Sequence, residues 1–90
     1  MDVHEARSEV AANVRALMGR GINGKRVTQA QLAAILDLKS QGAVSDRLSA
    51  KHPFDLDEML AIAAFFDVEV TDLLEGIARP SDAGDPVPAF

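Results

Sequence analysis

The sequence predicts a small all-α domain, and three observations support this fold class. Ninety residues are enough for one compact core of helices but not for a second domain. Apolar residues recur at helical spacing along most of the chain, whereas strand-like alternation of β-branched residues is hard to find. Helix start signals precede the periodic segments. We expect a compact five-helix domain over residues 1–78 and a flexible tail or linker over residues 79–90.

The first helix is expected over residues 3–18, with Asp2 as its N-cap and Glu5 as the partner of that cap. One stripe of this helix is apolar and should face the core; it consists of Val10, Val14, Leu17 and Met18. A glycine-rich basic loop follows over residues 19–26. Its three glycines should end the helix and leave the loop mobile.

The second helix carries a complete set of start signals. Thr28 can cap it, Gln31 completes a capping box, and Val27 with Leu32 forms a hydrophobic staple. Its apolar face consists of Leu32, Ala33, Ile35 and Leu36. These signals predict a short amphipathic helix beginning after Thr28.

A third helix follows after a break in the apolar pattern over residues 37–39. Ser40 can cap this helix, and its inward residues are Val44 and Leu48. Two helices this short bury little surface by themselves. Their usual joint use is to hold the second one against DNA.

Two further helices are expected after the loop that contains Pro53. Asp55 and Glu58 form a capping box at the start of the fourth helix, and Phe54 with Met59 forms a second staple. The residues expected to face inward are Leu56, Met59, Leu60, Ala63 and Phe66. A last short helix should follow a Thr71 cap, with apolar residues Leu73, Leu74 and Ile77.

Charge is distributed unevenly along the chain. The net charge is −5, but residues 15–51 carry seven Lys or Arg against two Asp, while residues 52–90 carry one Arg against nine acidic residues. The basic segment contains the two short helices and their flanks, where phosphate contacts would be made. Such polarity would orient the protein on DNA, and the alternative is ordinary charge scatter in a small acidic protein.

The segment TQAQLAAILDLKSQGAVSDRL, residues 28–48, resembles the helix-turn-helix of Cro/repressor-type proteins, also called the xenobiotic-response-element family. Its Thr28-Gln29-x-x-Leu32-Ala33-x-x-Leu36 signature is similar to the first motif helix of the family, and residues 40–48 are similar to its recognition helix. Residues 53–74 are similar to the two helices that follow. The resemblance covers residues 10–74 and implies a lambda-repressor-like, DNA-binding regulator of transcription.

The sequence departs from the family pattern at two places. The family usually has Gly at the position of Asp37, and its turn is one residue shorter, which makes Lys39 the extra residue here. Asp46 stands where many relatives carry a basic or neutral polar residue. Asp46 could accept a hydrogen bond from cytosine, or point away and pair with Arg47 or Lys51.

Several side chains of the expected recognition helix are candidates for reading bases. Gln41 lies in its first turn, where a glutamine amide can pair bidentately with adenine, and Ser45 lies one turn further on the same exposed side. Gly42 costs about 1 kcal/mol of helix propensity, but it would let the backbone approach the groove closely, unless it is merely tolerated there. The candidate base-reading residues are Lys39, Gln41, Gly42, Ser45 and Arg47.

Other residues are candidates for phosphate contacts. In the resembling family the position of Gln29 commonly contacts a phosphate, helped by the exposed amides of the helix start. The alternatives are a solvated glutamine at this position and a plain solvated linker for the basic loop. The candidate phosphate contacts are Arg20, Lys25, Arg26, Thr28, Gln29, Ser40 and Lys51.

We expect neither a catalytic site nor a metal or cofactor. His52, Asp55, Asp57 and Glu58 are close in sequence, but carboxylates belong at a helix N-terminus because of its dipole. No nucleophile elbow or glycine-rich phosphate loop is present in the sequence. The chain has no cysteine, no apolar run as long as the roughly 18 residues of a membrane span, and no secretory signal. A soluble cytoplasmic protein is therefore expected.

The expected function is that of a sequence-specific transcriptional regulator, of the phage- or prophage-repressor type, which binds a double-stranded DNA operator at the nucleoid of a bacterial host. One alternative is the antitoxin of a toxin–antitoxin pair, and another is a protein-interaction module that kept the fold but lost DNA binding. Relatives commonly bind as dimers. We expect a monomer or a weak homodimer in solution that pairs on DNA, with Leu73, Ile77 and the tail residues Val87 and Phe90 as the candidate contacts.

Overall fold

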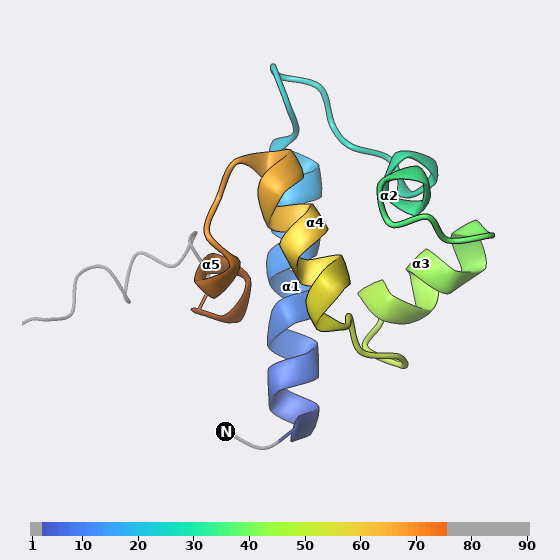
Figure 1. Cartoon of the computed structure of the whole chain (residues 1–90), viewed down its shortest axis with the longest axis vertical. Helices are drawn as coiled ribbons and strands as arrows, with labels where there is room; N and C mark the ends of the chain where they lie inside the picture. The colour runs from blue at the N-terminus through green and yellow to red at the C-terminus, as the bar shows by residue number, and fades with distance from the viewer. Residues whose placement is uncertain (1–2, 76–90) are drawn as a thin grey trace, which may run out of the picture.

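The structure, a computed structural model, describes residues 3–75 as five helices (Figure 1). The helices are α1 (Val3–Arg20), α2 (Gln29–Ile35), α3 (Gln41–Leu48), α4 (Leu56–Phe66) and α5 (Val70–Glu75). Because residues 3–75 contain no β-strand, the predicted all-α fold is confirmed. No helix within this range combines the length and the apolar character needed to span a membrane. The expected cap Asp2 and the expected tail, residues 79–90, lie outside the described residues.

Helix α1 runs through the centre of the domain, with α5 on one side and α2 and α3 on the other (Figure 1). It packs against α5 and α3, and α4 links the two sides by contacting both α5 and α2. The core fills the space between these helices. Its largest fully buried side chains are Val14, Leu17, Leu32, Val44, Ile62 and Leu73.

Helix α1 buries the predicted stripe but ends two residues later than expected. Its four stripe residues, Val10, Val14, Leu17 and Met18, are all buried. The helix continues through Gly19 to Arg20 and ends where Gly21 takes a left-handed φ of 77° and donates its N–H to Leu17 O at 2.8 Å. A Cβ at Gly21 would lie 2.0 Å from Lys25 O, so only glycine fits this position.

The loop after α1, which the sequence predicted as a glycine-rich linker, forms a tight hairpin. Ile22 and Lys25 exchange two backbone hydrogen bonds, with N···O distances of 2.8 and 3.0 Å. Asn23 and Gly24 between them both have positive φ, 53° and 79°, as a type I′ turn requires. Val27 N–H then donates to Met18 O at 3.0 Å, which fastens the hairpin to α1.

Helices α2 and α3 begin as predicted. Thr28 and Gln31 form the expected capping box: Thr28 Oγ1 accepts from the Gln31 N–H at 3.1 Å, and Gln31 Oε1 accepts from the Thr28 N–H at 2.8 Å. Ser40 Oγ accepts from the Ala43 N–H at 3.3 Å. Val44 and Leu48 are buried, as the periodicity predicted.

Asp37 in the turn between α2 and α3 explains why the resembling family has glycine here. Its φ is 56°, in the left-handed region where residues with a Cβ are strained. The Leu38 N–H donates to Ala33 O at 2.9 Å and the Asp37 N–H to Ala34 O at 3.2 Å, the two bonds of a Schellman motif. Aspartate is among the residues that tolerate this conformation best.

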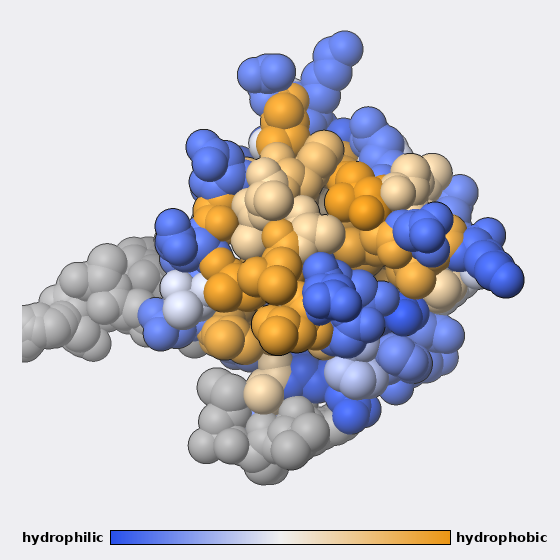
Figure 2. Space-filling model, viewed as in Figure 1, coloured by the Kyte–Doolittle hydropathy of each residue, from blue (hydrophilic) through white to orange (hydrophobic). Residues whose placement is uncertain are grey.

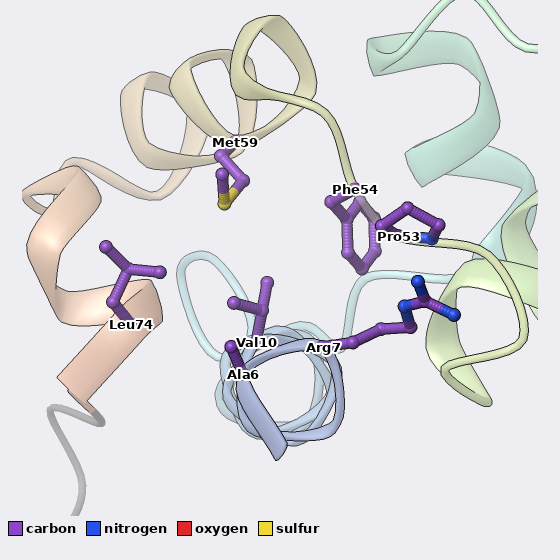
Figure 3. Close-up of a pocket in the computed structure, with 7 residues that line it drawn as sticks. All are labelled: Ala6, Arg7, Val10, Pro53, Phe54, Met59 and Leu74. Carbon is purple, nitrogen blue, oxygen red and sulfur yellow. The ribbon is translucent and has the colours of Figure 1, made fainter. Parts of the chain in front are cut away.

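Helix α4 has the predicted start, and Met59, Ala63 and Phe66 face the core as predicted. The Asp55–Glu58 capping box is present, and Phe54 and Met59 of the expected staple point into the same apolar cavity of about 190 Å³ (Figure 3). However, Leu56 and Leu60, which we expected to face inward, are 61% and 48% exposed. Ile62 takes the fully buried place instead. The helix is apolar on nearly every side, so its periodicity did not fully identify the inner one.

Helix α5 begins at Val70, two residues earlier than a Thr71 cap predicts. Thr71 is not its cap but lies inside the helix, and the Asp72 side chain accepts from the Glu69 N–H at 3.0 Å. Leu73 is fully buried, and its carbonyl accepts from Asn13 Nδ2 of α1 at 2.6 Å. Leu73 therefore belongs to the core and cannot form the dimer contact expected of it; Ile77, Val87 and Phe90 lie outside the described residues.

Candidate nucleic-acid interface

The candidate interface centres on α3, which is fastened to two other helices besides burying Val44 and Leu48. At its C-terminal end, an Arg15 guanidinium nitrogen on α1 donates to Leu48 O. Along its length, Arg47 Nε forms an ion pair with Glu58 Oε1 of α4 at 3.0 Å, and Arg47 Nη1 donates to Ala43 O at the same distance. A helix held at its C-terminal end by two other helices, and along its length by its core residues, presents its exposed side chains in a fixed orientation.

Arg47 is therefore not a base-reading residue in this structure, contrary to its place among the sequence candidates. Its side chain is only 13% exposed and that of Glu58 only 10%. Glu58 Oε1 also accepts from the Asp55 N–H at 3.1 Å, so one carboxylate completes the α4 cap and holds α3. Asp46 does not pair with Arg47, because Glu58 takes that position.

The solvent-facing side of α3 is polar and small. Its exposed residues are Gln41, Gly42, Ser45 and Asp46. A Cβ added at Gly42 would meet only Ser40 Oγ, at 3.6 Å, an ordinary van der Waals distance. The fold itself therefore does not require glycine at this position. Lys39 is exposed in the turn before the helix.

Three of the predicted phosphate contacts come together beside α1. Arg26, Thr28 and Gln29 line a hollow of about 330 Å³. Arg15, which the sequence reasoning did not single out, lies in the same hollow together with Met18, Val27 and Leu48. The residues that line this hollow thus include two arginines, a threonine and a glutamine, side-chain types that can donate hydrogen bonds to an anion. The only sequence signal for Arg15 was its membership of the basic segment.

The remaining basic candidates are exposed but lie outside this hollow. Arg20 ends α1, Lys25 lies in the hairpin, and Lys51 follows α3. Ser40 is exposed and engaged as the α3 cap. All of them lie in α1, the hairpin or the α2–α3 segment, and from Pro53 to Glu75 the sequence has no Lys or Arg.

Two of the three acidic residues near His52, Asp55 and Glu58, have structural roles. Asp55 Oδ1 accepts from the Glu58 N–H at 2.8 Å, and Glu58 pairs with Arg47. His52 Nδ1 lies 2.9 Å from Pro53 O. Among residues 5–75, no three His, Cys, Asp or Glu side chains are grouped so that they could hold a metal ion.

Comparison with models of protein families shows which family the chain belongs to. A model of the BetR domain matches residues 5–87, nearly the whole chain. The chain belongs to the BetR domain family. A BetR domain is a small helical domain of the helix-turn-helix type with a DNA-binding regulatory role in general, which agrees with the resemblance drawn from residues 28–48. No curated protein and no solved structure matches the chain.

Proposed function

We propose that this BetR domain is a sequence-specific regulator of transcription that sets α3 into the major groove of a double-stranded operator. The exposed, polar first turns of a firmly held α3 carry this proposal. Gln41 would read a base edge through its amide, Ser45 would contribute a second hydrogen bond, and Lys39 would approach from the preceding turn. Occupying the site would repress transcription by excluding RNA polymerase, as in repressors of the phage or prophage type, without any catalytic step.

Phosphate contacts would fix the register of α3 on the duplex. We assign one phosphate to the hollow lined by Arg15, Arg26 and Gln29, beside the capped start of α2. Lys25 and Arg20 would add contacts next to it, and Lys51 and Ser40 would do so near α3. Such contacts carry no sequence information, so their loss should weaken binding to all duplexes alike.

Gln41→Ala tests the proposal directly. Gln41 is exposed, so the free energy of unfolding should change by less than about 0.5 kcal/mol. Binding to the preferred duplex, selected from random sequences, should weaken by about 1–3 kcal/mol, while binding to unrelated duplexes stays nearly constant. Val44→Ala is the control: it should lower the melting temperature through lost core packing and leave base discrimination unchanged. Full discrimination in the Gln41→Ala protein would reject the assigned reading residue, and no salt-dependent affinity for any duplex would favour a protein-interaction module.

Gly42→Ala separates folding from DNA binding. Alanine has the higher helix propensity and fits the available space, so the substitution should stabilise the protein by up to about 1 kcal/mol. If the α3 backbone lies against the groove at this point, the added methyl group should nevertheless weaken operator binding. Gly19→Ala on α1, where an added Cβ would meet nothing within 4 Å, should stabilise without affecting DNA binding. Equal operator affinity of the Gly42→Ala and wild-type proteins would show that α3 docks through another part.

A further inference from the structure

A second surface of the domain, on α4, has the features of a binding site. It contains none of the proposed DNA contacts. Leu56, Leu60 and Ala64 are exposed at successive turns of the helix, spaced so that they form one continuous ridge. Phe65 beside this ridge is 40% exposed. Figure 2 shows apolar side chains gathered on the side of the molecule where α4 lies. We call Leu56, Leu60, Ala64 and Phe65 the α4 ridge.

The core does not account for the α4 ridge. The opposite side of the same helix already supplies Ile62, Ala63 and Phe66 to the core. A helix that is apolar on both sides normally has both sides covered. Single exposed leucines are common on protein surfaces, but a continuous exposed ridge of them marks an interaction surface.

The surroundings of the α4 ridge are acidic. Residues 53–75 contain seven Asp or Glu and no Lys or Arg. Asp57 is exposed on α4, and Asp67 is exposed directly after it. In the described part of the chain, Glu58 is the only one of these seven acidic residues that forms an ion pair with a basic side chain. The ridge therefore combines an apolar strip with uncompensated negative charge at its rim.

The apolar strip and its acidic rim indicate which kind of partner the α4 ridge binds. DNA is excluded by its charge, and the same surface of a second copy would place acidic residues against acidic residues. We propose that the α4 ridge docks an amphipathic helix of another protein, one whose apolar stripe is flanked by Lys or Arg. Leu56 and Leu60 would pack into that stripe, and Asp57 and Asp67 would pair with its basic flanks. Because the proposed DNA contacts lie outside α4, such a partner could bind while the domain occupies DNA.

Two synthetic helical peptides with the same leucine stripe, one with lysine and one with glutamate at its other positions, test this proposal on the full 90-residue chain. The lysine peptide should bind more tightly than the glutamate peptide by at least about tenfold in fluorescence anisotropy, and less tightly as salt is added. Leu60→Gln should weaken its binding by at least about tenfold and leave DNA affinity unchanged. Leu74→Gln, at a leucine of similar exposure that lines the Figure 3 cavity, should bind the peptide like the wild type.

Neutralising Asp57 and Asp67 at the rim of the α4 ridge tests whether charge contributes to binding of the partner. Asp57→Asn combined with Asp67→Asn should remove most of the preference for the lysine peptide, and circular dichroism would confirm that the variant is folded. Equal binding of the two peptides by the wild type would overturn the proposal, as would equal effects of Leu60→Gln and Leu74→Gln. A wild-type dimer in sedimentation that Leu60→Gln dissociates would also overturn it, because the ridge would then be covered by a second copy.

Discussion

The two sides of α1 are built on different principles. On the α2–α3 side, the helices have only seven and eight residues, yet each has a capping side chain, and Arg15 and Arg47 tie α3 to its neighbours. On the α4–α5 side, the surface is acidic and the longer helix α4 leaves leucines exposed. On the first side, polar contacts to neighbouring helices supplement the apolar packing of α3, whereas on the second side apolar residues of α4 remain exposed. Specific polar contacts fix the orientation of α3, and a helix that reads a base sequence needs a fixed orientation.

The largest effect should come from the ion pair that joins the two sides. Glu58→Ala leaves the guanidinium of Arg47 unpaired in a largely buried place and removes half of the α4 capping box. We expect a loss of about 3–5 kcal/mol in the free energy of unfolding, measured by urea denaturation. Asp57→Ala, one residue earlier and exposed, should cost less than about 1 kcal/mol. Similar costs at both positions would show that α3 does not depend on α4 for its place.

The orientation of α4 predicts the next largest effect. Ile62 is fully buried, so Ile62→Ala should lower the free energy of unfolding by about 2–5 kcal/mol. Leu60→Ala, at an exposed position on the other side of the helix, should change it by about 0.5 kcal/mol or less. The reverse ranking in thermal or urea unfolding would mean that the helix faces the core as its sequence pattern suggested.

The charge difference between the two sides should appear in DNA binding. Replacing Lys25 and Arg26 by Gln should lower the slope of log affinity against log salt by up to about two, because two phosphate contacts are lost. Glu69→Gln with Glu75→Gln is the matched control, since it also changes the net charge by two but on the acidic side. Its slope should remain that of the wild type. An unchanged slope in the first variant would place the hairpin away from the duplex.

The smallest effect concerns the helix ends, which are alike on both sides. Asp37 after α2 and Asp67 after α4 have left-handed φ values of 56° and 57°, and Ala50 after α3 has 66°. Ala50→Gly should stabilise the protein by about 1 kcal/mol, since alanine has no polar side chain to favour this conformation. Asp37→Gly should give a smaller gain. A loss of stability on Ala50→Gly, measured by thermal unfolding, would contradict the strain assigned to this position.

Local sequence signals identified the starts of α2, α3 and α4, but they placed the start of α5 wrongly and did not reveal the hairpin at Asn23-Gly24. The capping boxes at Thr28 and Asp55, the Ser40 cap and the buried stripe of α1 were all predicted and are all present. Each joins residues within a few positions of each other, so the energies that favour them are fixed by neighbouring residues. The sequence also showed that Asp37 stands where relatives have glycine, and the left-handed φ of Asp37 explains why glycine is common at this position.

Tertiary structure decided everything that joins distant parts of the chain. Periodicity cannot orient a helix that is apolar on both sides, so only packing against α5 and α2 showed that Ile62 is inside and Leu56 and Leu60 are outside. Arg47 was a candidate base reader until the fold brought Glu58 within 3.0 Å, and Arg15 had no assigned role until α1 met the end of α3. The sequence by itself determined where α2, α3 and α4 start and which segment is basic. Only the tertiary structure determined which charges are paired and which apolar residues remain exposed, because both depend on neighbours that are remote in sequence.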